Sequence, residues 1–196
     1  MKTDLTPEKW NALSLSHLLL ERQIGPGAFC VDATAGGGRD TAFLCRLCGP
    51  GGRVLAMDVQ PEAVRRTGLL LKEQGLTAQV VCDGHENLLR YLRPGEADAV
   101  VFNLGWLPGG DHGCFTRPET TLPALKAALT AIKPGGMVSV CIYYGRNNGF
   151  EEKDAVTAWM KTPDSRRYTV LVTEFANRPG CPALHAGIWR HQENER

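Results

Sequence analysis

The sequence lacks the features of a membrane protein, a secreted protein or a strongly basic nucleic-acid binder. No apolar stretch approaches the roughly 18 residues that a bilayer-spanning helix needs, and residues 1–10 are polar rather than signal-like. No run of five basic residues occurs, and the formal net charge of +1 offers no general attraction to a large polyanion. We therefore expect a cytoplasmic protein. If it binds nucleic acid, it must do so through a local basic surface.

The cysteines also lack the arrangement that a disulfide framework or a zinc site needs. Their number, seven, is odd, and most of them lie in apolar strand or helix patterns, which favours buried free thiols. Cys45 and Cys48 have the spacing of a redox or zinc pair, but no second such pair and no histidine pair completes four ligands. We predict no metal site.

What is present suits one globular domain. The chain has 196 residues, of which 43% are hydrophobic, and it contains no repeat, low-complexity segment or interdomain linker. We predict a single domain over residues 1–196. Residues 1–25 should hold a helix that precedes the first strand, with Thr6 as its N-cap and Pro7 at its first position. His17 lies in this helix, where we expect it to be solvated or capped.

The stretch from Ala28 to Thr41 organises the rest of the chain. A short apolar run ending in Val31 predicts a buried parallel strand, and residues 36–38 form a glycine turn that opens into a helical pattern. Glycines let the backbone come close to a ligand, and the free amides at a helix start favour anionic or polar groups. The stretch predicts a nucleotide-like cofactor lying across this loop.

The spacing of the loop narrows the choice of cofactor. The dinucleotide fingerprint needs a small residue where Thr41 stands, which disfavours a nicotinamide oxidoreductase. The remaining pattern of Asp32, Gly36 and Gly38 is similar to motif I of class I S-adenosyl-L-methionine (SAM) methyltransferases, with Thr34 where many members carry a glycine. The alternative is a glycine-rich turn that only connects a strand and a helix.

Further strands alternate with helices along the chain. We expect strands at residues 53–57, 78–82, 97–102 and 137–143, helices at 61–74, 122–132 and 150–160, and an antiparallel pair at 167–175 and 184–189. Five βα units and a terminal hairpin fit an α/β, Rossmann-like class I methyltransferase fold. Its sheet would have seven mostly parallel strands, with helices on both faces and a C-terminal antiparallel hairpin.

Polar residues follow several of these strands. Asp58 ends the second strand, where a carboxylate can hold the ribose hydroxyls, although it could partly serve the next helix. Asp83 and His85 are candidates for the adenine edge, although Asp-Gly is also a plain turn signal. The predicted cofactor contacts are Asp32, Ala33, Thr34, Gly36, Gly38, Asp40, Thr41, Asp58, Gln60, Asp83, His85 and Asn103.

Residues 103–112 form a second informative stretch beyond a central strand, where open α/β sheets place their ligands. Asn103 followed by Trp106 is similar to the Asn/Asp-Pro-Pro-aromatic loop of amino-group methyltransferases, in which the amide oxygen holds the target amine. Alternatively, Trp106 is core and Asn103 caps a turn. The predicted catalytic residues are Asn103, which accepts from the amine, Asp111 or His112, which orients it or takes its proton, and Tyr144, which walls the pocket.

Together these motifs resemble one family, formerly labelled rRNA methylases and associated with tRNA 5-aminomethyl-2-thiouridine methylation (MnmM-like). The matches are residues 32–38, 103–111, 117–121 and 143–145, with Phe175, Asn177 and Pro182, and they span nearly the whole chain. Trp106 departs from an expected tyrosine, and residues 146–148 depart from an expected loop. The resemblance implies SAM as methyl donor and the aminomethyl nitrogen of a tRNA wobble uridine as acceptor. Methylation of rRNA or of a small-molecule amine, and a non-catalytic SAM-binding protein, are the alternatives.

The resemblance also implies how RNA is held. A wobble base lies in a single-stranded loop, so it can be splayed out and stacked on Trp106 or Tyr144. Arginines on the same sheet edge would meet phosphates. The predicted substrate contacts are Trp106, Gly109, Gly110, Arg117, Tyr143, Arg146 and Arg178. The expected partner is the tRNA anticodon loop, and the modest net charge suggests a homodimer that supplies a second surface.

Overall fold

The computed structural model describes residues 6–106, 115–145 and 149–192. Five predicted site residues, Gly109, Gly110, Asp111, His112 and Arg146, therefore lie outside the described residues. Within these ranges, no helix is both long and apolar enough to cross a bilayer.

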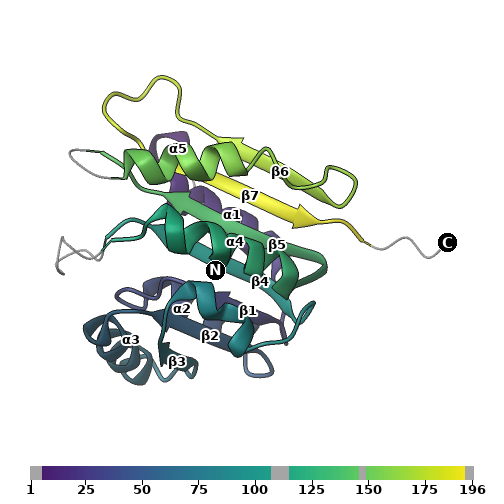
Figure 1. The fold of residues 1–196 in the computed structure, drawn as a ribbon. Helices are drawn as coiled ribbons and strands as arrows, with labels where there is room; N and C mark the ends of the chain where they lie inside the picture. Colours follow the sequence, from purple (N-terminus) through teal and green to yellow (C-terminus); the bar gives the residue numbers. More distant parts are fainter. Residues whose placement is uncertain (1–5, 107–114, 146–148, 193–196) are drawn as a thin grey trace.

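One seven-stranded sheet forms the centre of the molecule (Figure 1). Its strands are β1 (Phe29–Asp32), β2 (Arg53–Asp58), β3 (Gln79–Cys82), β4 (Ala97–Leu104), β5 (Ile132–Ile142), β6 (Tyr168–Thr173) and β7 (Leu184–Arg190). They follow the order β3-β2-β1-β4-β5-β7-β6, and only β7 pairs antiparallel with its two neighbours. The predicted fold class, a mostly parallel sheet with a C-terminal antiparallel hairpin, is confirmed.

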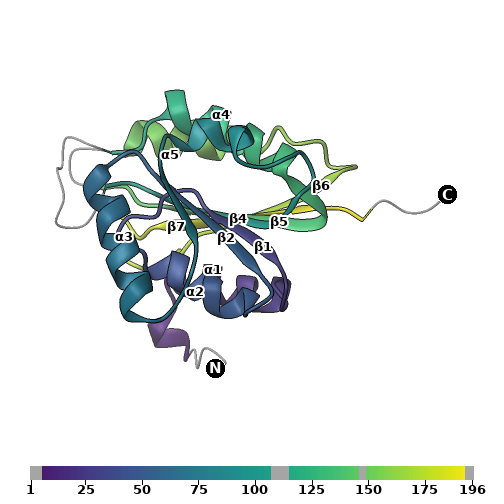
Figure 2. The same cartoon turned by 90° about the horizontal axis from the view of Figure 1, so that it is seen from below.

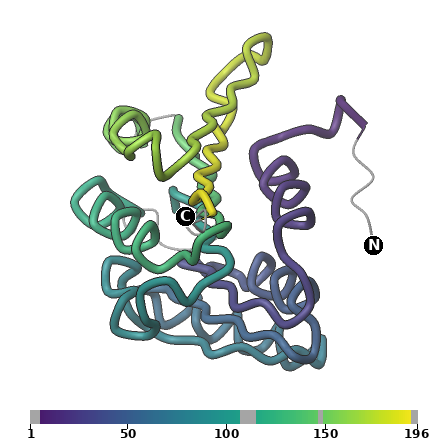
Figure 3. The backbone as a smooth tube through the Cα atoms, turned by 90° about the vertical axis from the view of Figure 1, so that its right-hand side faces the viewer, coloured from purple at the N-terminus to yellow at the C-terminus, as the bar shows by residue number. Residues whose placement is uncertain are grey.

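Helices cover both faces of the sheet (Figure 2). One face carries α1 (Ala12–Gln23), α2 (Arg39–Cys48) and α3 (Pro61–Glu73), and the other carries the 3-10 helix η2 (His85–Arg90), α4 (Pro118–Ala131) and α5 (Phe150–Trp159). In the edge-on view of Figure 3, α1 (purple) and α5 (green) lie on opposite sides of the yellow C-terminal hairpin.

Neighbouring strand residues belong to different core clusters. Val101 of β4 packs with Leu20 and Leu44 from the α1–α3 face, whereas Phe102 packs with Leu125 from the α4 face. Successive side chains of a strand point to opposite faces, so both of these positions are buried. A central parallel strand must therefore be apolar over most of its length, which explains why it could be recognised in the sequence.

The predicted start of the first helix is wrong. Residues Pro7–Lys9 form a separate 3-10 helix, η1, and Thr6 makes no side-chain cap. The helix α1 instead begins after Asn11, whose Oδ1 accepts a 2.8 Å hydrogen bond from the Ser14 amide, while the Asn11 amide donates to Ser14 Oγ at 2.9 Å. This reciprocal capping box satisfies two amides, which one Thr6 hydroxyl cannot do.

Two further boundaries differ from the prediction. The helix α4 begins at Pro118 rather than at residue 122, with a proline in its first turn. The strand β5 begins at Ile132 rather than at residue 137, because residues 133–136, expected only to end the helix, belong to the strand, with Gly135 at a φ of 79°. The pairing of this extension with β4 is irregular between Ala97 and Ala99.

The strand order places the site. From β1 the chain builds outward through β2 and β3, and then returns to β4 on the other side of β1. Ligands of open α/β sheets bind beyond the carboxyl ends of the strands at such a reversal. The loops after Asp32 and after Leu104 meet at this point.

Away from this site, three buried polar side chains from α1, β5 and β7 lie in a row. Ser16 Oγ lies 2.7 Å from Ser139 Oγ, which lies 3.0 Å from His185 Nε2, and all three residues are 0% exposed. The other ring nitrogen, His185 Nδ1, has no hydrogen-bond partner within the described part of the chain. Burial lowers the pKa of His185 to about 4, well below the ordinary value.

This burial predicts a stability loss in mild acid. The unfolded chain takes up the histidine proton below its ordinary pKa of about 6.5, whereas the folded chain does so only near 4. The His185 contribution to stability is thus complete above pH 6.5 and is lost as the pH falls from 6.5 to 4. Between pH 7.5 and pH 5, the free energy of unfolding of the wild type, measured in urea, should fall by about 2 kcal/mol more than that of His185→Gln. Equal losses would contradict this, and His191→Gln, at an exposed position, is the control.

Candidate cofactor and acceptor site

A cavity of about 980 Å³ opens at the carboxyl ends of β1, β2 and β4. This volume is at the upper end of the roughly 300–1,000 Å³ that is usual for small-molecule sites. Of the predicted site residues, those that line it are Ala33, Thr34, Gly36, Asp40, Asp58, Gln60, Asp83, His85, Asn103, Trp106, Arg117 and Tyr143. The structure thus brings the glycine loop and the Asn103 stretch to a single cavity.

Asp32 and Thr41 hold the glycine loop from behind. The Asp32 side chain is 0% exposed; its Oδ2 accepts a 2.6 Å hydrogen bond from Thr41 Oγ1, and its Oδ1 accepts one from the Thr34 amide at 3.2 Å. Burial, together with the nearby charge of Asp40, raises the pKa of Asp32 to about 7. Neither Asp32 nor Thr41 lines the cavity, so in this structure they support the loop rather than reach the cofactor.

The two predicted glycines of the loop serve different purposes. Gly36 lines the cavity, and its amide donates a 2.9 Å hydrogen bond to Asp58 Oδ2. Gly38 does not line it; its φ is 81°, and an added Cβ would lie 2.8 Å from the Thr67 Cα on α3. Glycine is needed at position 38 because α3 packs directly against the loop.

The side chain of Asp58, the last residue of β2, links this strand to the glycine loop by a hydrogen bond. Its Oδ1 accepts a 2.9 Å hydrogen bond from the Gln60 amide, while Oδ2 holds the Gly36 amide. Each carboxylate oxygen keeps a further lone pair, and the side chain lines the cavity. Asp58 can therefore order the glycine loop and accept ribose hydroxyls at the same time.

Asp83 and His85 also line the cavity. Tyr91 Oη, Asn87 Nδ2 and the Gly84 amide each donate a 2.8 Å hydrogen bond to Asp83, and these bonds, that of Tyr91 foremost, lower its pKa. Asp83 thus fixes the start of η2. His85 is 7% exposed, and burial lowers its pKa, so a neutral imidazole lines this part of the cavity.

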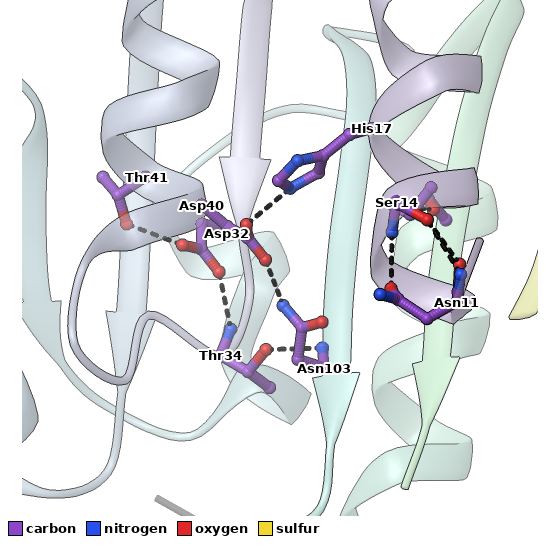
Figure 4. A network of polar contacts seen from close by, with 10 residues as sticks. Asn11, Ser14, His17, Asp32, Thr34, Asp40, Thr41 and Asn103 are labelled. Carbon is purple, nitrogen blue, oxygen red and sulfur yellow. Dashed lines mark hydrogen bonds and ion pairs between the residues drawn. The ribbon is translucent and has the colours of Figure 1, made fainter. Parts of the chain in front are cut away.

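Asn103 is held by one main-chain and one side-chain hydrogen bond (Figure 4). Its amide N–H donates to Thr34 Oγ1 at 2.7 Å, and its Nδ2 donates to Asp40 Oδ2 at 2.5 Å. A carboxylate only accepts hydrogen bonds, so this contact settles which end of the side-chain amide is nitrogen. Its Oδ1 is buried and has no hydrogen-bond partner among the described residues. An unsatisfied buried acceptor costs about 1–3 kcal/mol, and a bound N–H donor would remove that cost.

Glu152 anchors the loop that follows Asn103. Trp106 and Phe115 form an antiparallel bridge. Thr116 Oγ1 accepts from the Gly105 amide at 2.8 Å and donates to Glu152 Oε2 at 2.6 Å. Glu152 is 3% exposed, and its burial raises its pKa. Nothing in the sequence pattern pointed to Glu152, because an acid in the first turn of a helix is the ordinary partner of the helix dipole.

Of the two neighbouring tyrosines, the structure brings only Tyr143, the expected substrate contact, to the cavity. Tyr143 lines the cavity, whereas the Tyr144 ring packs against Phe150, with 5.5 Å between ring centroids, and lies under Lys153 Nζ at 5.2 Å. Tyr144 is thus turned toward α5 and is not brought to the cavity. Adjacent residues at a strand end point in opposite directions, so only one of the two can face the ligand.

The predicted arginines are dispersed. Arg117 lines the cavity, with its guanidinium carbon 4.8 Å from the centre of the Phe115 ring. Arg178 instead stacks on Phe175 at 4.3 Å and donates to the Trp10 carbonyl. It is not brought to the cavity.

The Cys45–Cys48 pair is not arranged as a metal site. Cys48 Sγ lies 3.5 Å from Cys30 Sγ, in the buried layer between α2 and β1. In the ranges that the structure describes, no three His, Cys, Asp or Glu side chains are placed to share a metal ion.

Comparisons with known proteins agree with this geometry. A family model described as "Putative rRNA methylase" matches residues 54–188. An Arabidopsis thaliana protein named "tRNA (mnm(5)s(2)U34)-methyltransferase, chloroplastic" is 35% identical over 185 residues, which cover 88% of this chain and 67% of that protein.

Two solved structures share the fold and much of the sequence. A "putative rRNA-methylase" from Clostridium thermocellum has a TM-score of 0.90 and 41% identity, with 95% of this chain and 100% of that chain covered. A "putative methyltransferase" from Streptococcus mutans, crystallised in complex with SAH, has a TM-score of 0.84 and 33% identity, with coverage of 92% and 98%.

Proposed function

Because this chain belongs to the rRNA methylase family, we propose that it is a SAM-dependent methyltransferase that acts on the aminomethyl nitrogen at C5 of a tRNA wobble uridine. The Arabidopsis relative carries the corresponding tRNA activity in its name, and the Streptococcus mutans relative was crystallised with SAH. Within this chain, the observation that carries the proposal is the buried Asn103 Oδ1, which has no hydrogen-bond partner in the part of the chain that the structure describes and belongs to the same cavity as the glycine loop.

The residues of the cavity fit SAM. Asp58 offers carboxylate lone pairs for the ribose hydroxyls, the loop around Gly36 brings backbone to the cavity wall, and neutral His85 can meet the adenine. When bound, SAM supplies an electrophilic methyl group on a sulfonium. The remaining tasks, which are positioning and the removal of one proton, belong to the chain.

The acceptor must arrive as a neutral amine. An alkylammonium is protonated at pH 7 in water, and burial beside an aromatic ring lowers its pKa. One proton leaves the ammonium, Asn103 Oδ1 accepts a hydrogen bond from a remaining N–H, and the nitrogen lone pair forms the new N–CH₃ bond as the S–CH₃ bond breaks. Tyr143 rather than Tyr144 walls this pocket. Asp111 or His112 remains our proposed proton acceptor.

RNA would enter the cavity past the bridge between Trp106 and Phe115. Trp106 lines the cavity beside its bridge partner Phe115 and is our proposed stacking surface for the wobble base. Arg117, which also lines the cavity, is our proposed contact for a phosphate of the anticodon loop. Arg146 and Arg178 remain proposed phosphate contacts farther along the RNA. A homodimer that lengthens this surface, and a cytoplasmic location, also remain proposals.

Transfer of a labelled methyl group from SAM identifies the substrate. We expect the purified protein to label bulk tRNA from cells that lack this methyl group and to leave fully modified tRNA unlabelled. Digestion should place the label in the wobble nucleoside. Label confined to rRNA or to a small amine would favour those alternatives. SAM binding without any transfer would identify a non-catalytic binding protein.

A further inference from the structure

The Asp40 carboxylate joins the first helix to Asn103. Its Oδ1 lies 2.7 Å from His17 Nε2 on α1, and its Oδ2 accepts the 2.5 Å hydrogen bond from Asn103 Nδ2 on β4 (Figure 4). Each oxygen thus holds one partner. A chain of three side chains runs from the outer helix to the buried acceptor atom of the cavity.

The His17 ring is itself fixed in place. It stacks on Phe43 of α2, with 3.9 Å between ring centroids and an angle of 14° between the planes. The side chains of His17 and Asp40 are 23% and 11% exposed, so their contact is largely shielded from water. His17 does not line the cavity, so it can influence the acceptor only through Asp40.

The orientation of the Asn103 amide depends on this chain. The terminal torsions of Asp and Asn are broad, so packing alone holds neither group at one angle. If the Asp40 carboxylate rotates, the hydrogen bond that keeps Asn103 Nδ2 on the Asp40 side is lost, and the amide can turn. A turned amide would present N–H groups to the amine, and these cannot accept its hydrogen bond.

We propose that His17 is a positioning residue for methyl transfer: by holding Asp40, it keeps the Asn103 amide oxygen directed at the acceptor amine. The inference rests on the proposed function, because it assigns a purpose to the same acceptor atom. The competing explanation is that His17 only packs α1 against α2. That explanation predicts that stability and SAH affinity fall together with activity.

The first experiment separates these explanations by kinetics. His17→Leu should lower kcat on undermethylated tRNA by about 10- to 100-fold, as expected for the loss of one hydrogen bond to a charged group. The dissociation constant for SAH should stay within about twofold of the wild-type value. His17→Gln, whose amide nitrogen can donate to Asp40, should recover most of kcat, and His191→Leu should change nothing. A fall in SAH affinity that matches the fall in kcat would overturn the proposal.

A double variant tests whether the effect passes through Asn103. In an Asn103→Ala background there is no amide left to orient, so His17→Leu should change kcat by less than about twofold. Losses that multiply would show that His17 acts independently of Asn103, and the positioning role would be wrong.

A measurement without substrate keeps the two proposals apart. In ¹⁵N NMR spectra, one proton of the Asn103 side-chain NH₂ should be shifted downfield and protected by its bond to Asp40. The shift should disappear in His17→Leu and return in His17→Gln. If these shifts appear while no tRNA is methylated, the proposed function fails and the orienting chain stands. If tRNA is methylated and His17→Leu leaves the shift unchanged, the inference fails and the function stands.

Discussion

Replacing Asn103 by alanine is expected to lower kcat for tRNA methylation by about 10²- to 10³-fold, which is the usual cost of removing one preorganised hydrogen-bonding group from an active site. The substitution removes the one buried acceptor of the cavity that has no partner among the described residues. SAM and SAH should bind with nearly unchanged affinity, because the glycine loop and Asp58 are untouched. Single-turnover kinetics with labelled SAM and calorimetric titration with SAH measure the two quantities.

The control for this variant is Gln79→Ala, the same loss of an amide at an exposed position on β3. It should leave both the rate and the affinity unchanged. Thermal unfolding should also be compared, since Asn103→Ala removes one of the two side-chain partners of the Asp40 carboxylate. Near-normal turnover in folded Asn103→Ala would mean that residues 103–112 have a structural role, and our catalytic assignments would be wrong.

Replacing Asp58 by alanine is expected to raise the dissociation constants of SAM and SAH together by at least about 10- to 100-fold. The change removes the proposed ribose acceptor and frees the Gly36 and Gln60 amides, and a hydrogen bond to a charged group is worth about 1.5–3 kcal/mol. Asp58→Asn should fall between the alanine variant and the wild type, because one amide oxygen remains to accept.

The matched control is Asp154→Ala on α5, whose side chain is 72% exposed. It should bind SAM as the wild type does. Titration with NAD belongs in the same series. Tight binding of NAD, with no response to SAM, would contradict the assignment of the cofactor and with it the role of Asp58.

The fold was largely predictable because the sheet is buried on both sides. Strands such as β1 and β4 must be apolar along their length, so they stand out against the polar turns that follow them. Polar residues directly after strand ends were predictable for the same reason, and Asp58 and Asn103 do line the cavity. Element starts were less predictable, because Thr6 and Asn11 are both good caps and only the packed structure chooses between them.

The parts of the site that the sequence did not predict depend on contacts between residues that are far from each other in the sequence. His17 was expected to be solvated or capped, and its proposed role depends on Asp40, 23 residues away. Glu152 acts through Thr116, 36 residues away, and Gly38 is constrained by Thr67 on another helix. The choice between Tyr143 and Tyr144 depends on which face the last strand residue presents, and a one-residue error reverses it.

The place of β1 at the reversal of the strand order bears on how the protein folds during synthesis. About 70 residues separate the end of β1 from the end of its partner β4, which at roughly 5–20 residues per second corresponds to about 4–14 s of translation. Once β3 has been made, and until β4 follows, a nascent unit of β1, β2 and β3 leaves unpaired the edge of β1 that β4 will occupy. The loop after β1 gains its tie to Asn103 only when β4 arrives. The complete cavity, to which Asn103 contributes, can therefore form only after β4 has been made, and until then the open edge of β1 is exposed to pairing with other chains.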